Sequence, residues 1–179
     1  MLKLKKIIII LAAVVLMFAF SHGYIEKNYI YPLKYSEYVE KAAAEYDVDK
    51  YLVYSIIKAE SSFNEYARSH ADAKGLMQFT DETAKWAEEK MNMHEDFNIY
   101  NPEININIGT WYISKLLNDN GGDLVLALAS YNAGGGNVKK WLENSGKDEL
   151  DIDKIEFEET KTYVAKTLKY YEKYKNLYD

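Results

Sequence analysis

Cysteine is absent from the 179-residue chain, and proline and histidine are scarce, with two and three copies. Without cysteine the chain has no disulfide, no cysteine-based zinc site, no thiol nucleophile and no acylated cysteine of a lipoprotein. The three histidines, His22, His70 and His94, are too far apart in the sequence to form a His-x-x-x-His pair. A metal site built from two histidines of one helix is therefore excluded.

Positive charge is scarce once the N-terminus is set aside. The first 23 residues hold three lysines and no acid, which leaves 19 basic and 28 acidic side chains in the remaining 156 residues. An acidic body of this kind repels phosphate groups, so nucleic acid is not an expected partner. A body of this length has room for one domain with a hydrophobic core.

The N-terminal segment has the composition of an export signal. Three lysines precede 14 apolar residues, Ile7 to Phe20, and this run is shorter than the ~20 residues of a straight membrane-spanning helix. An uncleaved membrane anchor and a cleaved signal peptide both stay open; we favour the anchor, because Ala19-Phe20-Ser21 is a poor cleavage site. Either way the lysines stay cytoplasmic and the body lies outside the cytoplasm, at the cell membrane or secreted. We expect a signal or anchor segment at 1–23, a linker at 24–34 and one domain at 35–179.

Beyond residue 24 the apolar spacing is typical of short helices, and no segment has the two-residue period of a strand. Ser36, Asp47 or Asp49, Thr80 or Asp81, and Asp123 are suitable N-terminal caps, and Pro102 suits a first helical position. The expected helices run from Ser36 to about Tyr46, from Asp47 or Asp49 to include Glu60, from Thr80 or Asp81 to Met91, from Pro102 until Gly121-Gly122 stops it, from Leu124 to Ala129, around Val138 to Glu143 and from about Glu158 to Tyr178. The predicted fold class is all-α, with about six to eight short helices.

Glu60 stands out because it shares a helical face with apolar residues. Val53, Ile56, Ile57 and Glu60 have the spacing i, i+3, i+4 and i+7. Removal from water and the negative end of the helix dipole both raise the pKa of a carboxyl group there. Such an acid can protonate a leaving-group oxygen near neutral pH. The alternative is a glutamate at the edge of the face whose carboxylate reaches water.

Three sequence blocks follow one another between Tyr38 and Tyr174. They are Glu60 to Asn64 with Ser69 and Gly75-Leu76-Met77-Gln78; Ala129 to Gly134 with Gly136 and Val138; and Phe157, Glu159, Thr160, Tyr163 and Val164. In this order and spacing they resemble the signature of lytic transglycosylases with a goose-type lysozyme-like fold, the soluble lytic transglycosylase catalytic domain family. The resemblance implies that residues 35–179 form a lysozyme-like catalytic domain.

The resemblance also implies a reaction and a site. The enzyme would cleave the β-1,4 bond between N-acetylmuramic acid (MurNAc) and N-acetylglucosamine (GlcNAc) in peptidoglycan and form 1,6-anhydro-MurNAc, with Glu60 as acid and then base. The implied substrate-binding residues are Ser69, Gly75, Leu76, Met77, Gln78, Tyr131, Asn132, Glu159 and Tyr163. No metal or organic cofactor is implied. The expected partners are peptidoglycan glycan strands and, through the N-terminal segment, the membrane, with the protein a monomer.

Other interpretations of these residues stay open. Taken singly, Ser69 is as well explained as a cap, Asn132 as a turn residue and Tyr131 as a core residue. Departures from the family pattern are Glu65, Asp72 and Glu156 in place of proline, glycine and proline, and Thr80 in place of methionine. No second carboxylate lies on the helical face of Glu60 or in the block Gly75-Leu76-Met77-Gln78 (the Gly75 block). This absence favours a transglycosylase. A hydrolytic goose-type lysozyme using Asp72 or Asp81, and a non-catalytic peptidoglycan-binding envelope protein, are the alternatives.

Overall fold

The computed structural model describes residues 5–6, 10–11, 17–18, 23–93, 97–146 and 150–179. The chain divides into two compact units, residues 1–34 and residues 35–179. In the first unit, the π-helix η1 (Glu26–Ile30) lies within the expected linker. No helix in the described part of the chain is long and apolar enough to cross a membrane. Most of the expected signal or anchor segment, residues 1–23, lies outside the described residues, so that expectation stays a prediction.

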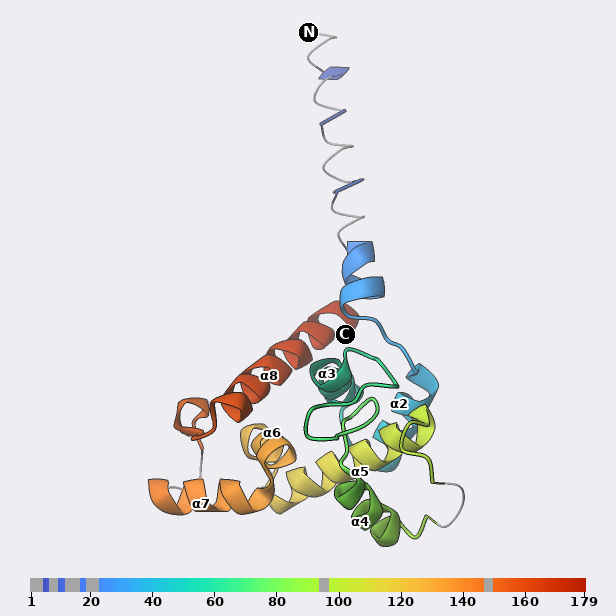
Figure 1. The fold of residues 1–179 in the computed structure, drawn as a ribbon. Coiled ribbons are helices and arrows are strands. Elements are labelled where there is room, and N and C mark those ends of the chain that lie inside the picture. The colour runs from blue at the N-terminus through green and yellow to red at the C-terminus, as the bar shows by residue number, and fades with distance from the viewer. Residues whose placement is uncertain (1–4, 7–9, 12–16, 19–22, 94–96, 147–149) are drawn as a thin grey trace. The chain divides into compact units, whose positions relative to one another are not determined.

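The second unit is helical (Figure 1). Its elements are α2 (Ser36–Glu45), α3 (Lys50–Ser61), α4 (Asp81–Met91), α5 (Pro102–Asp119), α6 (Leu124–Ala133), α7 (Gly135–Ser145), the 3-10 turn η2 (Ile152–Lys154) and α8 (Glu158–Tyr178). Between these described helices there are two isolated β-bridges, Arg68 with Lys74 and Lys74 with Phe79, and no strand. The predicted all-α class is therefore confirmed.

Among the described α-helices, α3, α4, α5 and α6 begin at a side-chain cap, whereas α2, α7 and α8 do not. The side chains of Asp49, Thr80 and Asp123 each accept a hydrogen bond from the first turn of α3, α4 and α6. The expectation that Ser36 caps α2 is wrong: Ser36 is already helical, and Tyr35 precedes it in the left-handed region with φ 60° and no side-chain cap. The local sequence pattern did not reveal that α2 starts after a left-handed tyrosine, because tyrosine rarely adopts positive φ.

The centre of the second unit is formed by α3 and α6. In Figure 1, α8 runs along one side of this pair and α5 crosses the other side, in agreement with the contacts of α3 with α8 and of α6 with α5, α7 and α8. Residues 51–57 of α3 and residues 126–130 of α6 are buried. The central place that the apolar run from Leu124 predicted for its helix is confirmed, and the helix extends further, to Ala133.

The segment between α3 and α4, residues 62–80, is called the site loop here. It contains no helix, and backbone hydrogen bonds between Lys74 and Phe79 close it into a tight turn, with N···O distances of 2.9 and 3.0 Å. Leu76 and Met77, inside that turn, are fully buried. The positive-φ residues of the loop are Ser62, Phe63, Asp72, Gly75 and Gln78. The loop is thus held by long-range burial and left-handed residues and not by a regular element.

Candidate active site

Glu60 lies in the last turn of α3. Its helix begins at the Asp49 cap, where the carboxylate accepts a hydrogen bond of 2.8 Å from the Tyr51 amide. Val53 and Ile56 on the same face are fully buried, whereas Glu60 keeps part of its surface exposed. The helix ends at Ser61, because Ser62 turns into the left-handed region with φ 51°. The predicted alignment of Glu60 with an apolar face is what the structure contains.

The surroundings of Glu60 raise its pKa to about 7. Desolvation by the surrounding protein is the main cause, although the side chain retains some contact with solvent, and the nearby Glu159 carboxylate acts in the same direction. The Tyr163 hydroxyl and the Lys166 ammonium oppose the rise. The Tyr163 hydroxyl is buried and makes no hydrogen bond of standard geometry among the described residues, although it lies near enough to Glu60 to lower the pKa of that group. At neutral pH the carboxyl group is divided between its acid and its carboxylate form.

Glu60 borders two cavities. The first, of about 380 Å³, is lined by Glu60, Ser69, Ala71, Ala73, Gln78, Phe79, Thr80, Thr83, Tyr112, Tyr131, Asn132, Ala133, Gly134 and Glu159. The second, of about 420 Å³, is lined by Ala59, Glu60, Asn132, Glu158, Glu159, Thr162, Tyr163 and Lys166. Hollows of about 460 and 560 Å³ lie elsewhere without Glu60, so size alone does not select the site. What distinguishes these two cavities is the desolvated acid that they share.

Two residues of α6 are fixed in place by bonds to other elements. The Tyr131 hydroxyl donates a hydrogen bond of 2.9 Å to the Met77 carbonyl, and its ring packs against Tyr112 and Phe79. The Asn132 side-chain oxygen accepts a hydrogen bond of 2.7 Å from the Thr160 hydroxyl on α8. These bonds hold both polar side chains at the cavity rim in one orientation, as a binding site for sugars requires.

The Gly75 block holds the site loop against α5. Gly75 has φ 80°, and a Cβ on it would stand 2.3 Å from the Asn105 side-chain nitrogen. Asn105 is fully buried; its side chain accepts a bond of 2.7 Å from the Met77 amide and donates one of 2.9 Å to the Ile99 carbonyl. Gly75, Leu76 and Met77 are buried and do not line either cavity. The structure therefore places them behind the cavity wall.

Gln78 and Ser69 belong to both the loop and the cavity wall. The Gln78 side-chain nitrogen, Nε2, donates hydrogen bonds to the backbone carbonyls of Ala67 and Gly75, at 3.1 and 2.8 Å. The Ser69 hydroxyl accepts a bond of 3.1 Å from the Ala73 amide. Both side chains also line the first cavity. Their bonds within the loop fix where these polar groups meet the cavity.

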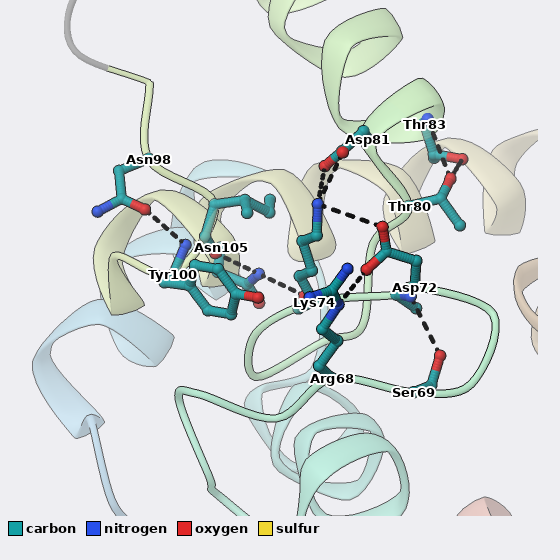
Figure 2. A network of polar contacts seen from close by, with 12 residues as sticks. Arg68, Ser69, Asp72, Lys74, Thr80, Asp81, Thr83, Asn98, Tyr100 and Asn105 are labelled. Atoms are coloured by element: carbon teal, nitrogen blue, oxygen red, sulfur yellow. Dashed lines mark hydrogen bonds and ion pairs between the residues drawn. The ribbon is translucent and has the colours of Figure 1, made fainter.

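Asp72 and Asp81 lie in a network of ion pairs on the outside of the site loop. Figure 2 shows Lys74 between the two carboxylates and Arg68 paired with Asp72. The Arg68 guanidinium lowers the pKa of Asp72, and Lys74 adds to this effect. Neither aspartate lines a cavity that Glu60 borders. The aspartates that the lysozyme alternative would require are therefore not brought to Glu60.

The structure thus brings most of the expected site residues together. Glu60, Ser69, Gln78, Tyr131, Asn132 and Glu159 line the first cavity, and Tyr163 lines the second. The sequence analysis did not single out Phe79, Thr83 and Tyr112 in the first cavity or Lys166 in the second. Lys166 could have been found, because Glu159, Tyr163 and Lys166 have the spacing i, i+4 and i+7 of one helical face. In the described residues, no group of three or more histidine, aspartate or glutamate side chains could hold a metal ion.

Comparison with known proteins reveals relatives of this chain. The chain is 34% identical over 148 residues to the soluble lytic murein transglycosylase of Salmonella typhimurium, across 78% of this chain and 23% of that protein. It is 37% identical over 121 residues to the membrane-bound lytic murein transglycosylase C of Sodalis glossinidius, across 59% of this chain and 32% of that protein. The chain therefore spans about a quarter to a third of the length of these relatives.

A solved structure and a family model agree with these relatives. The X-ray structure of an inactive glutamate-to-glutamine mutant of the lytic transglycosylase Slt from Pseudomonas aeruginosa superimposes with a TM-score of 0.73 and 31% identity, over 82% of this chain and 25% of that one. The fold is therefore lysozyme-like, as the sequence resemblance implied. The family model described as Transglycosylase SLT domain matches residues 37–153. The chain belongs to the Transglycosylase SLT domain family.

Proposed function

We propose that this chain is a peptidoglycan lytic transglycosylase that cleaves the β-1,4 bond between MurNAc and GlcNAc. The observation that carries the proposal is Glu60, a desolvated carboxyl group with a pKa of about 7 at the junction of two cavities. A pKa near the working pH is what a group needs in order to give and take a proton in one cycle. The family, whose relatives are named lytic murein transglycosylases, supports the same activity.

In the proposed reaction Glu60 acts twice. The protonated carboxyl donates its proton to the glycosidic oxygen, and the bond between that oxygen and C1 of MurNAc breaks. The Glu60 carboxylate then removes the proton of the MurNAc 6-hydroxyl, whose oxygen bonds to C1 and closes the 1,6-anhydro ring. The proton count returns to its starting value, and no water is consumed. One carboxyl group therefore suffices, provided that its two forms are close in energy.

The remaining polar side chains at the cavities would bind and orient the glycan strand. Ser69, Gln78, Tyr131 and Asn132 offer neutral hydrogen-bonding groups to acetamido and hydroxyl groups, on side chains whose positions are fixed. Glu159 and Tyr163 would contribute from α8. Gly75, Leu76 and Met77 would serve the site indirectly, by holding the wall in shape. The proposed partner is thus a glycan strand that crosses both cavities, with no cofactor.

Glu159 is the carboxylate that keeps a hydrolytic mechanism worth testing. It lines both cavities and acts electrostatically on Glu60. A lysozyme mechanism would need such a second carboxylate as nucleophile or to activate water. Because Glu159 is exposed at the rim, we assign it to substrate binding. The products of the wild-type protein and of Glu159→Gln separate the two mechanisms.

The experiment is mass spectrometry of the muropeptides released from purified peptidoglycan by the full chain, kept in mild detergent because of its apolar N-terminal run. We expect products that end in 1,6-anhydro-MurNAc, both from the wild type and from Glu159→Gln. Reducing ends that disappear in Glu159→Gln would establish the lysozyme alternative instead. A folded wild-type protein that releases nothing would favour the non-catalytic envelope protein.

We also propose that the N-terminal segment anchors the domain outside the cytoplasm, at the cell membrane. Its lysines followed by 14 apolar residues support this placement, and a relative is named membrane-bound. If the linker at 24–34 is extended, it would let the domain reach at most roughly 40 Å from the bilayer. Cell fractionation followed by intact-mass measurement tests the anchor. A soluble exported species that begins near His22 would contradict it without affecting the enzymatic proposal.

A further inference from the structure

One face of α8 is directed at the end of α3 that carries Glu60. Glu159, Tyr163 and Lys166 follow one another on this face at i, i+4 and i+7, and all three line the second cavity with Glu60. The Lys166 ammonium donates a hydrogen bond of 3.0 Å to the Ala59 carbonyl, the residue immediately before Glu60. It also lies 6.0 Å from the centre of the Tyr163 ring. Lys166 is thus hydrogen-bonded to the backbone immediately before Glu60.

The Ala59 carbonyl is among the last four carbonyls of α3, which have no partner within a regular helix. A cationic donor satisfies such a group better than a neutral one and opposes the negative end of the helix dipole. Because Lys166 comes from α8, its bond fixes the end of α3 against a second helix. The position of the Glu60 backbone therefore depends on a contact that spans 107 residues of sequence.

The positive charge of Lys166 also lowers the pKa of Glu60. The titratable groups that line the two cavities with Glu60 are Tyr112 from α5, Tyr131 from α6 and Glu158, Glu159, Tyr163 and Lys166 from α8, while α2, also packed against α3, contributes no charged group to either cavity. Burial raises the pKa of Tyr112, and it raises the pKa of Tyr131 and Tyr163 well above the usual value, so all three stay neutral. Among the described residues that line the two cavities, Lys166 is the cationic one. A negative charge on Glu60 has this ammonium as its counter-charge.

We propose that Lys166 is a positioning residue for Glu60: it fixes the end of α3 through the Ala59 carbonyl and stabilises the Glu60 carboxylate that exists between the two proton transfers. The inference rests on the proposed function, in which Glu60 is a carboxylate after it has given up its first proton and before it takes the second. Glu159, two turns before Lys166 on α8, works against that state, and Lys166 offsets it. The lysine thereby keeps the acid and carboxylate forms of Glu60 close in energy.

The test compares the full-length wild type with Lys166→Met, Lys166→Arg and the control Lys169→Met. Methionine keeps the apolar stem and removes the charge, arginine keeps the charge, and Lys169 lies on the same helix but lines neither Glu60 cavity. The readouts are the pH dependence of muropeptide release and the titration of the Glu60 carboxyl carbon by ¹³C NMR. Thermal melting identifies any variant that does not fold.

In Lys166→Met we expect the pKa of Glu60 and the alkaline limb of the pH profile to rise together, by about 1 unit. Lys166→Arg and Lys169→Met should stay at the wild-type positions. An unchanged Glu60 titration in folded Lys166→Met, or an equal rise in Lys166→Arg, would overturn the proposal. Because NMR titration requires no turnover, an inactive wild type would refute the proposed function while the assignment of Lys166 is still decided.

Discussion

The first cavity has two walls that are built in different ways. The helical wall takes Glu60, Tyr131, Asn132 and Glu159 from α3, α6 and α8, and its acid is largely removed from water. The wall formed by the site loop takes its side chains from residues 69–80, and ion pairs among Arg68, Asp72, Lys74 and Asp81 cover its outer side (Figure 2). One wall therefore carries a desolvated carboxyl group, and the other carries carboxylates neutralised by neighbouring cations.

The same functional group behaves in opposite ways on the two sides. Desolvation raises the pKa of Glu60 to about 7, whereas the hydrogen bond from Arg68 lowers the pKa of Asp72. Near neutral pH Glu60 can therefore deliver a proton, and Asp72 cannot. Environment, and not residue type, separates the candidate acid from a structural carboxylate. The predictions below test this separation, and the largest expected effect comes first.

The largest effect is expected from Glu60→Gln. The amide keeps the shape of the side chain but cannot deliver a proton, so the rate of muropeptide release should fall by about 10²–10⁴-fold with the fold intact. Glu172→Gln, at an exposed position far along α8, is the matched control and should retain full activity. Near-wild-type release by pure, folded Glu60→Gln would remove Glu60 from the catalytic role.

A large structural effect is expected on the other wall, from Gly75→Ala. The new Cβ would stand 2.3 Å from the Asn105 side chain and 2.8 Å from the Ile99 carbonyl, at a residue with φ 80°. Strain and overpacking together should lower the free energy of unfolding by about 2–5 kcal/mol in denaturant titrations. Gly122→Ala provides the control, since φ is 87° there and an added Cβ would meet no atom within 4 Å beyond the neighbouring residues. A similar loss in both variants would mean that backbone strain alone, and not the contact with Asn105, is responsible.

A moderate effect on activity and stability is expected from a change of pH, because the Glu60 carboxyl group titrates near neutrality. Since the acid form starts the reaction, activity should fall about tenfold per pH unit above its pKa of about 7. Glu60 also binds its proton more tightly in the folded protein than in the unfolded chain, where its carboxyl group has the ordinary pKa of 4.5. Its contribution to stability is therefore complete below pH 4.5 and is lost as pH rises through 7, by at most about 3 kcal/mol.

Denaturation at pH 5 and pH 8 measures this loss, with Glu60→Gln as the reference because it has no titrating group at this position. The free energy of unfolding should decrease more in the wild type than in Glu60→Gln over that interval. Equal pH dependence in the two proteins would show that the Glu60 carboxyl group titrates at an ordinary pKa.

The smallest effect is expected from Asp72→Asn. Asparagine tolerates the left-handed conformation that Asp72 adopts at φ 61°, and exposed ion pairs contribute little to stability. Activity should stay within about twofold of the wild type, and the products should not change. A loss as large as that of Glu60→Gln would give Asp72 a catalytic role and restore the lysozyme alternative. Product mass spectrometry under the conditions used for Glu60→Gln provides the comparison.

The difference between the walls also explains how much the sequence could predict. Periodicity and caps such as Asp49 and Asp123 act within a few residues, so the helices and the apolar face of Glu60 were accessible from sequence. The docking of α8 on α3, which brings Lys166 to Ala59, depends on contacts between distant segments. The spacing places Lys166 on one face with Glu159 and Tyr163, but no local pattern reveals which helix that face contacts, and the family model ends at residue 153, before α8.

The site loop was the harder part to predict. Its course depends on positive φ at Phe63 and Gln78, which these residue types do not favour, and on the distant Asn105. The residues of the Gly75 block were accessible through the family resemblance. The burial of Leu76 and Met77 behind the wall was not, because a buried turn and an exposed turn can share one sequence. The roles assigned to the individual site residues stay predictions until the variants are measured.

The Met77 peptide unit has a consequence for hydrogen exchange. Its amide is bonded to Asn105 of α5, its carbonyl to Tyr131 of α6, and its side chain is fully buried. A solvent deuteron can reach this amide only if the loop separates from both helices, which would also break the packing of the core. The Met77 proton should therefore persist as long as those in the middle of α6, and this non-helical segment should open only in the global unfolding of the domain.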